Sequence, residues 1–306
     1  MLCSVVVPVF NEEENLKELY GRLKDVLEGM NRQYEVIFVD DGSEDKSLEI
    51  IKMLASSDKA VKYRALTRNF GHEASSTAGL DIAKGDVVVL MDADLQDPPE
   101  LIPQMLKLWQ EGNQLVYARR LRRYGENIFR RVSAKFFYRL IALISDSEIP
   151  VDTGDFRLMD RAVVNDFLKC REQNRFVRGL TSWVGYKQAA LNFERDRRFA
   201  GESKYNTFKL LLLMLDVITG FSIKPLRVAT ALGFLVTVLS MVMVCVIVIQ
   251  KFFFNLNIQG YALLVTGLFF MGGVQMFFLG IIGEYIGKIY RQVQGRPLYL
   301  VKEESF

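Results

Sequence analysis

The sequence predicts an α/β domain built on a mostly parallel sheet, followed by a two-helix membrane hairpin. Four short apolar runs alternate with segments that carry apolar residues at helical spacing, which is typical of a sheet covered by helices on both faces. Two uncharged runs of membrane length follow Pro225. Six basic and three acidic residues also follow Pro225, so 33 of each sign precede it. The chain therefore divides into a charge-balanced soluble part and an apolar tail.

The strands of the soluble part are expected where the sequence is short, apolar and rich in Val, Ile or Leu, at residues 4–9, 35–40, 61–67 and 86–92. Residues 12–27 and 47–55 are expected to form helices between them, and Ser43 is a candidate N-cap for the second. The first strand is no signal peptide, because it lacks a basic flank and runs into Pro8 and a group of acids.

Acidic and turn-forming residues follow three of these strands. Phe10 and Glu12 come after the first, Asp40 and Asp41 end the second, and Asp92-Ala93-Asp94 follows the fourth. Parallel sheets bind ligands beyond the carboxyl ends of their strands, so we expect a site there. Two carboxylates separated by one residue can share a hard divalent cation, although such a pair also caps turns without binding metal.

Other nucleotide-binding and metal-binding patterns are absent from the sequence. No G-x-G-x-x-G follows the first strand and no P-loop motif occurs. Both a nicotinamide-dependent enzyme and a P-loop ATPase are therefore disfavoured. The three cysteines are scattered without metal-ligand spacing, which is typical of a reducing cytosol. A pocket lined by carboxylates remains.

The two long apolar runs, residues 228–249 and 260–283, are expected to span a membrane. Lys224 and Arg227 precede the first run, three basic residues follow the second, and the short connection carries no charge. By the positive-inside rule, both termini and the soluble domain are expected in the cytoplasm. Gly283 and Gly287 form a small-xxx-small pair that permits close helix contact within one chain or between chains, and a homo-oligomer is expected.

A cluster of eight basic residues between Arg119 and Arg139 interleaves with apolar residues at helical spacing. Such a cluster is often a solvated face or a nucleic-acid site. In a membrane-tethered chain we interpret it as a basic amphipathic helix, at about residues 126–145, on the anionic membrane surface, with no nucleic-acid partner. A second amphipathic stretch, residues 207–221, leads toward the first span.

The motifs around these strand ends carry a family resemblance. They are Val7-Pro8-Val9-Phe10-Asn11-Glu12, Val39-Asp40-Asp41-Gly42-Ser43, Arg68-Asn69-Phe70-Gly71 and Asp92-Ala93-Asp94-Leu95-Gln96-Asp97-Pro98-Pro99. In this order they resemble glycosyltransferase family 2, whose GT-A fold uses nucleotide-sugar donors. The later block Phe199-Ala200-Gly201-Glu202-Ser203-Lys204-Tyr205, followed by two spans and Gly283-Glu284-Tyr285-Ile286-Gly287, is similar to bacterial polyprenyl-phosphate glycosyltransferases, relatives of dolichol-phosphate mannose synthase.

The resemblance implies roles on the donor side. It places the nucleoside, expected to be that of UDP, against residues at the ends of the first two strands and near Arg68, with Asp41 near the ribose or in a supporting role. It implies Mg²⁺ or Mn²⁺ on the diphosphate, held by Asp92, Asp94 and Gln96. The nucleotide-sugar set is therefore Pro8, Phe10, Glu12, Asp40, Asp41, Arg68 and Asp92.

The resemblance also implies residues on the acceptor side. Arg119, with Arg130 or Arg131, is expected to bind the lipid phosphate, and Arg198, Ser203 and Lys204 belong to a loop expected to close over the site. The catalytic candidate is Asp155, preferred over Asp152, as a base or as a group that orients the acceptor. A phosphate monoester is largely a dianion at pH 7 and needs little deprotonation. His72, the only histidine, is assigned to a turn or donor-pocket contact rather than to base catalysis.

The implied reaction is inverting transfer of a hexose, with glucose from UDP-glucose as the leading candidate, to undecaprenyl or another polyprenyl phosphate at the cytoplasmic membrane face. A processive polysaccharide synthase and a non-catalytic carrier of lipid-linked sugars are the alternatives. The first lacks its Q-x-x-R-W motif here, and the intact Asp92/Asp94 pair disfavours the second. The expected segments are a GT-A domain at 1–204, a juxtamembrane helix at 205–224, spans at 225–254 and 260–290, and a cytoplasmic tail at 291–306.

Overall fold

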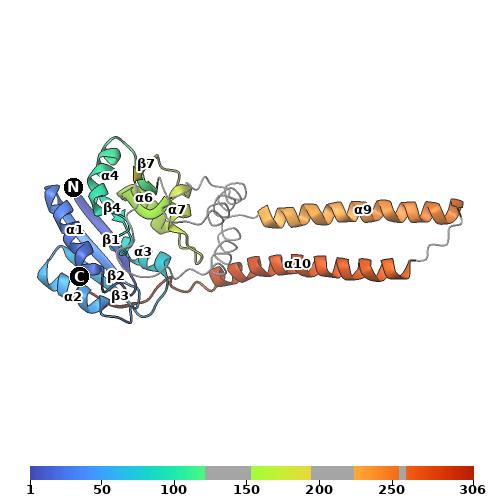
Figure 1. The fold of residues 1–306 in the computed structure, drawn as a ribbon, viewed down its shortest axis with the longest axis horizontal. Coiled ribbons are helices and arrows are strands. Elements are labelled where there is room, and N and C mark those ends of the chain that lie inside the picture. Colours follow the sequence, from blue (N-terminus) through green and yellow to red (C-terminus); the bar gives the residue numbers. More distant parts are fainter. Residues whose placement is uncertain (121–152, 194–223, 255–259) are drawn as a thin grey trace. The chain divides into compact units, whose positions relative to one another are not determined.

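The computed structural model describes residues 1–120, 153–193, 224–254 and 260–306 (Figure 1). These residues fall into two compact units. One unit contains the soluble domain together with residues 296–306, and the other contains the two long apolar helices. The two expected amphipathic helices, at 126–145 and 207–221, lie outside the described residues.

The soluble domain is built on one mixed sheet with the strand order β7-β5-β6-β4-β1-β2-β3-β8. Its centre, β4-β1-β2-β3, is parallel, and the prediction of an α/β domain with a mostly parallel sheet is confirmed. The chain runs outward from β1 to β3 and then returns to place β4 on the other side of β1. In sheets of this kind ligands bind where the strand order changes direction, which here is at the carboxyl ends of β1 and β4. The strands are β1 (Leu2–Val9), β2 (Gln33–Asp40), β3 (Val61–Leu66), β4 (Val87–Leu90), β5 (Leu115–Arg120), β6 (Thr153–Asp160), β7 (Gln188–Phe193) and β8 (Val301–Glu304).

Helices cover both faces of the sheet, as buried parallel strands require. One face carries α1, α2 and α4, whose apolar side chains join Val5 and Val7 of β1 in a single core. On the other face, α3 approaches β1 so closely that a Cβ on Gly79 would lie 2.3 Å from Val6 Cγ1. The described helices of this unit are α1 (Leu16–Gly29), α2 (Ser47–Ser57), α3 (His72–Leu80), the short 3-10 helix η1 (Pro99–Leu101), α4 (Ile102–Gln110), α6 (Arg161–Lys169) and α7 (Val177–Trp183).

The expectation that Ser43 caps α2 is wrong. The residue that precedes α2 is Lys46, and the Ser43 hydroxyl instead accepts a hydrogen bond from the Asn11 amide at 3.1 Å. Ser43 does not cap α2 because its hydroxyl bonds to the loop after β1. Asn11 of that loop is in the left-handed conformation at φ 55° and presents its backbone amide to Ser43. Its hydroxyl joins two strand ends rather than starting a helix.

The end of the chain adds an edge strand that the sequence pattern did not signal. Strand β8 pairs antiparallel with β3, and Arg64 of β3 donates two hydrogen bonds to Glu304 Oε2 at 2.9 and 2.6 Å. The Tyr299 hydroxyl donates to Asp81, directly after α3, at 2.6 Å. Part of the expected tail is thus built into the soluble domain's sheet.

The second unit contains α9 (Lys224–Phe254) and α10 (Tyr261–Val293). Each has an apolar stretch long enough to cross a membrane, and among the described side chains of those stretches only Lys288 is buried within the chain. Phe234 and Leu268, for example, are 73% and 74% exposed. Large apolar side chains make up the buried core of the soluble domain, whereas here they are exposed along two long helices. The two helices therefore fit a membrane hairpin.

Candidate functional site

The loops that follow β1 and β2 are joined by hydrogen bonds at the carboxyl edge of the sheet. Asn11 accepts from the Glu44 amide at 2.8 Å, and the Ser47 hydroxyl accepts from the Glu12 amide at 2.9 Å. Gly42, in the loop after β2, has φ +69°, and a Cβ there would lie 2.5 Å from the carbonyl carbon of Arg68 in the loop after β3. Only glycine fits this approach, so the strand ends are held as one surface.

Asp40, the last residue of β2, presents an acceptor at this surface. Its carboxylate is buried; Oδ2 accepts from the Ser43 amide at 3.3 Å, while Oδ1 has no partner among the described residues. Burial raises the pKa of this carboxyl group. A buried carboxylate oxygen without a donor is costly unless a ligand N–H or O–H reaches it. Asp40 is therefore suited to accept a hydrogen bond from a ligand N–H or O–H.

Asp41 supports the neighbouring turn. Its two carboxylate oxygens accept from the Phe70 and Gly71 amides at 2.8 and 2.9 Å. Burial raises the pKa of Asp41 while these two bonds favour the ionised form. These contacts hold the turn from which α3 begins.

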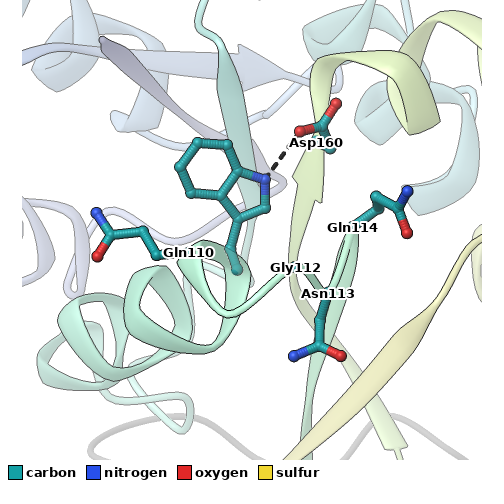
Figure 2. A pocket seen from close by; sticks show the side chains of 6 residues that line it. Gln110, Gly112, Asn113, Gln114 and Asp160 are labelled. Carbon is teal, nitrogen blue, oxygen red and sulfur yellow. Dashed lines mark hydrogen bonds between the residues drawn. The ribbon is translucent and has the colours of Figure 1, made fainter.

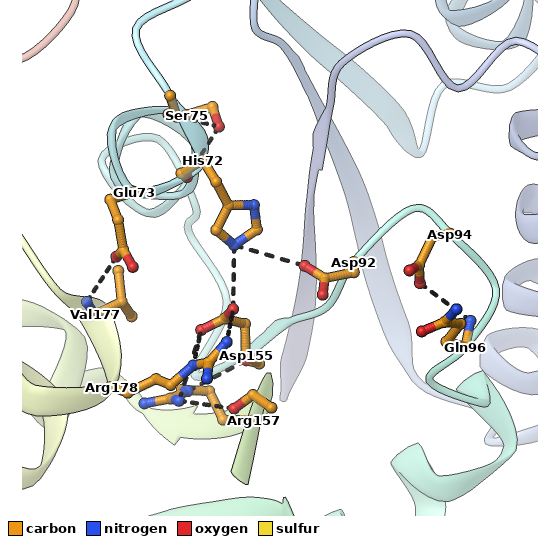
Figure 3. Close-up of polar contacts among 12 residues, drawn as sticks. His72, Glu73, Ser75, Asp92, Asp94, Gln96, Asp155, Arg157, Val177 and Arg178 are labelled. Carbon is orange, nitrogen blue, oxygen red and sulfur yellow. Dashed lines mark hydrogen bonds and ion pairs between the residues drawn. The ribbon is translucent and has the colours of Figure 1, made fainter. Parts of the chain in front are cut away.

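His72, Asp92 and Asp155 meet at the same edge (Figure 3). Strands β4 and β6 pair antiparallel with Leu90 opposite Arg157, and the same register continued by two residues places Asp92 opposite Asp155. His72 Nε2, from the first residue of α3, lies 3.6 Å from Asp92 and 3.4 Å from Asp155. Burial lowers the pKa of His72, but the bond to Asp155 and the charge of Asp92 outweigh it and raise that pKa to about 10. The imidazole thus lies beside two carboxylates that favour its protonated form.

Asp155 is paired with Arg178 from α7. The guanidinium donates to both carboxylate oxygens, at 2.8 and 2.6 Å. Burial would raise the pKa of Asp155, but Arg178 and His72 hold it well below its ordinary value. The pairing suits a positioning group better than a base, because a carboxylate held ionised in this way accepts a proton poorly.

Two further charged residues complete this cluster. Arg157 is buried, donates to the carbonyls of Gly154 and Asp155 and to the Thr181 hydroxyl of α7, and has its pKa lowered to about 10 by burial. Glu73 Oε2 accepts from the Val177 amide at 2.7 Å, and burial raises the pKa of Glu73. Glu73, Arg157 and Arg178 were not among the residues expected in the site. Their roles depend on contacts between segments far apart in the chain, for which the sequence pattern held no signal.

The metal candidates lie beside this cluster. Asp94 and Gln96 occupy the turn after Asp92, where Asp94 Oδ1 accepts a hydrogen bond from the backbone N–H of Gln96 at 3.2 Å (Figure 3). Burial raises the pKa of Asp92, and His72 lowers it. The nearby charges of Asp155 and Asp94 raise it further, and the net pKa is above the ordinary value. A divalent cation would relieve this repulsion, so the Asp92 and Asp94 carboxylates fit a metal. Asp155 is less suited as a ligand, because Arg178 occupies both of its oxygens.

Some of the remaining predicted site residues lie in the part of the chain that the structure describes, and others lie outside it. Pro8 lies within β1; Phe10 is exposed; Glu12 accepts from the Asn15 side chain at 2.6 Å. Arg68 is exposed and stacks on the Phe70 ring at 4.1 Å, and Arg119 of β5 donates to Asn192 at 2.8 Å. The residues outside the described part are Asp152, Arg130, Arg131, Arg198, Ser203 and Lys204.

A hollow of about 420 Å³ lies elsewhere in the soluble domain, and Trp109, Asn113 and Asp160 are among the residues that line it (Figure 2). The Trp109 indole donates to Asp160 at 2.8 Å. Asp160 pairs with Val87 at the start of β4, so the hollow lies at the opposite edge of the sheet from Asp92. It is separate from the carboxylate cluster.

Comparisons with known proteins agree with this geometry. The profile of glycosyl transferase family 2 matches residues 4–168, and that of the GtrB C-terminal hairpin matches residues 224–289. The chain is 42% identical to the bactoprenol glucosyl transferase of Shigella phage SfII, over 99% of this chain and 98% of that protein. It is 46% identical to the glycosyltransferase YkcC of Bacillus subtilis, over 98% and 93%.

A solved structure supports the fold. Glucosyl-3-phosphoglycerate synthase from Mycobacterium tuberculosis, in complex with Mn²⁺, UDP-glucose and phosphoglyceric acid, matches with a TM-score of 0.50 and 21% identity. The match covers 71% of this chain and 77% of that chain. With the family profile, it confirms the expected GT-A fold.

Proposed function

This chain belongs to glycosyltransferase family 2, and from that premise we propose that it transfers glucose from UDP-glucose to a polyprenyl phosphate, with inversion at the anomeric carbon. The observation that carries the proposal is that Asp40, whose Oδ1 has no partner among the described residues, and the Asp92–Asp94 pair end or follow parallel strands at the same edge of the sheet. That edge offers places for a nucleobase and a diphosphate. The sugar and the lipid are inferred from the full-length bactoprenol glucosyl transferase relatives.

On the donor side, Asp40 binds the uracil ring and accepts its N–H, while Pro8, Phe10, Glu12 and Arg68 surround the nucleoside. Asp41 holds the turn before α3. Asp92, Asp94 and Gln96 hold Mg²⁺ or Mn²⁺, which when bound neutralises negative charge on the diphosphate leaving group. The Asp94 carboxylate is held within this turn by the backbone amide of Gln96.

On the acceptor side, a phosphate oxygen of the lipid attacks the anomeric carbon as the bond from that carbon to UDP breaks. The acceptor is largely a dianion at pH 7, because its second pKa is about 6, and it needs no base. Asp155 and Arg178 act as a fixed charged pair that orients the groups around the reacting carbon. Arg119, Arg130 and Arg131 bind the lipid phosphate, and the loop with Arg198, Ser203 and Lys204 closes to exclude water.

The membrane arrangement extends the same proposal. The catalytic domain comprises residues 1–204 together with β8 from the tail. Residues 205–224 are proposed as a juxtamembrane helix, and both termini lie in the cytoplasm with the hairpin spanning the membrane. A homo-oligomer forms through the small-residue face of α10 around Gly283 and Gly287. Reporter fusions at each terminus test the orientation, and cytoplasmic signal from both is expected.

The reaction is tested with the full chain in detergent, undecaprenyl phosphate, and labelled UDP-glucose, UDP-galactose or GDP-mannose. Metal-dependent, chelator-sensitive label in the organic phase from UDP-glucose is expected, and loss of that label in Asp94→Asn but not in the exposed control Asp25→Asn would support the site. Label from another donor would correct the sugar, a long polymer would favour a processive synthase, and loss of both transfer and metal-dependent UDP binding would favour a non-catalytic carrier.

A further inference from the structure

Glu73 lies in the first turn of α3 and points away from the metal candidates toward α7 (Figure 3). Its Oε2 accepts a hydrogen bond from the Val177 amide, the first amide of α7, at 2.7 Å. The two residues are 104 positions apart. Neither the donor nor the acceptor roles described above use this carboxylate.

The contact supplies α7 with a cap that its own sequence lacks. The N-cap residue of α7 is Phe176, whose side chain has no hydrogen-bond acceptor for the free amides of the first turn. A carboxylate at that position satisfies one of these amides and interacts favourably with the positive end of the helix. Glu73 therefore fixes where α7 begins.

The start of α7 matters because the next residue is Arg178. Its guanidinium holds both oxygens of Asp155, which faces Asp92 across the β4–β6 register. One turn later, the Thr181 hydroxyl contacts the buried Arg157, which bonds to the backbone of β6. α7 is thus tied to α3 through Glu73 and to β6 through Thr181, and the two ties set the position of Arg178.

We propose that Glu73 is a positioning residue for sugar transfer, which holds α7 in register so that Arg178 meets Asp155 at the reacting centre. This proposal rests on the proposed function for its catalytic readout. Small displacements of catalytic groups cost large factors in rate, so loss of the contact should lower kcat more than it alters KM for the donor.

The test compares Glu73→Ala with Glu73→Gln, which keeps an acceptor oxygen, and with Glu49→Ala, which removes an exposed first-turn glutamate from α2. Glu73→Ala should lower kcat about 10- to 50-fold with KM for UDP-glucose within about threefold of wild type. Glu73→Gln should recover most of the loss, and Glu49→Ala should match wild type. In an Arg178→Gln background, Glu73→Ala should have almost no further effect, because both changes remove the same interaction.

Amide hydrogen exchange gives a readout that needs no turnover. Exchange in residues 177–183 should rise in Glu73→Ala but not in Glu73→Gln or Glu49→Ala. Equal losses in the Ala and Gln variants, unchanged exchange, or full additivity with Arg178→Gln would overturn the positioning role. If the wild type transfers no sugar to lipid while exchange responds as expected, the proposed function fails, and the contact between Glu73 and α7 stands as a structural one.

Discussion

The two ends of α3 carry charged groups with opposite uses. At its first turn, His72 and Glu73 face Asp92, Asp155 and the start of α7. Directly after its last turn, Asp81 accepts two hydrogen bonds from Arg171, at 3.0 and 2.5 Å, and one from Tyr299 of the tail. Between them the helix is made of small buried residues that allow close packing on β1.

The two ends show that α3 both positions residues of the candidate site and attaches the C-terminal segment to the soluble domain. The first end gathers carboxylates that repel one another and need cations, which is a common feature of reactive sites. The second end joins complementary partners, and Arg64 adds bonds to the Ala78 carbonyl, to Tyr299 and to Glu304. Changes at the first end should therefore affect activity, whereas changes at the second should affect stability.

The largest effect is expected from Asp94→Asn, next to the first end. Removing one metal-binding carboxylate should lower lipid glucosylation about 10³-fold, because charge on the departing diphosphate would be poorly neutralised. Transfer of label into the organic phase measures this change. The thermal unfolding midpoint should stay near that of wild type. A loss of activity caused by unfolding would contradict the assignment of the first end of α3 to activity rather than stability.

Asp155→Asn should have a smaller effect, about 10- to 100-fold on kcat. The variant keeps the size of the side chain but loses the charged pair with Arg178, and the acceptor phosphate still supplies its own nucleophilic oxygen. The same transfer assay compares it with Asp94→Asn. If Asp155→Asn proved the more damaging of the two, a proton-accepting role would replace the positioning role.

At the second end, Glu304→Gln should destabilise the soluble domain by about 1.5 kcal/mol, because it weakens two charge-assisted bonds from the largely buried Arg64. Denaturant unfolding of the full chain in detergent measures this effect. Lys52→Ala removes only the exposed pair with Glu303 and should leave stability unchanged. A large loss of kcat without loss of stability in Glu304→Gln would break the division between the ends.

Tyr299→Phe should have the smallest effect, about 1 kcal/mol of stability at pH 7. Burial and the hydrogen bond to Asp81 raise the pKa of Tyr299, so its contribution is complete below about pH 10, where tyrosine in the unfolded chain begins to ionise. Above that pH the contribution declines as the unfolded chain gains stability by ionising. The difference in unfolding free energy between wild type and Tyr299→Phe should shrink as pH rises above 10, and a difference that grew there would contradict this assignment.

The sequence by itself determined the central parallel strands, the acidic residues at their ends and the two apolar helices. Each of these is a local signal: an apolar run of strand length, a D-x-D directly after such a run, or an uncharged stretch long enough for a bilayer. Asp40 and Asp92 were identified from such signals, because the carboxyl ends of parallel strands necessarily share one edge.

The tertiary structure decided the rest of the site. Asp155 faces Asp92 only because β6 enters the sheet antiparallel to β4 in one particular register. Glu73 and Arg178 meet their partners only after α3 and α7 are packed, and β8 finds β3 from more than 230 residues away. Hydrophobic periodicity reports the face that each segment buries, whereas charge pairing between distant segments depends on strand order and register, which no local pattern encodes.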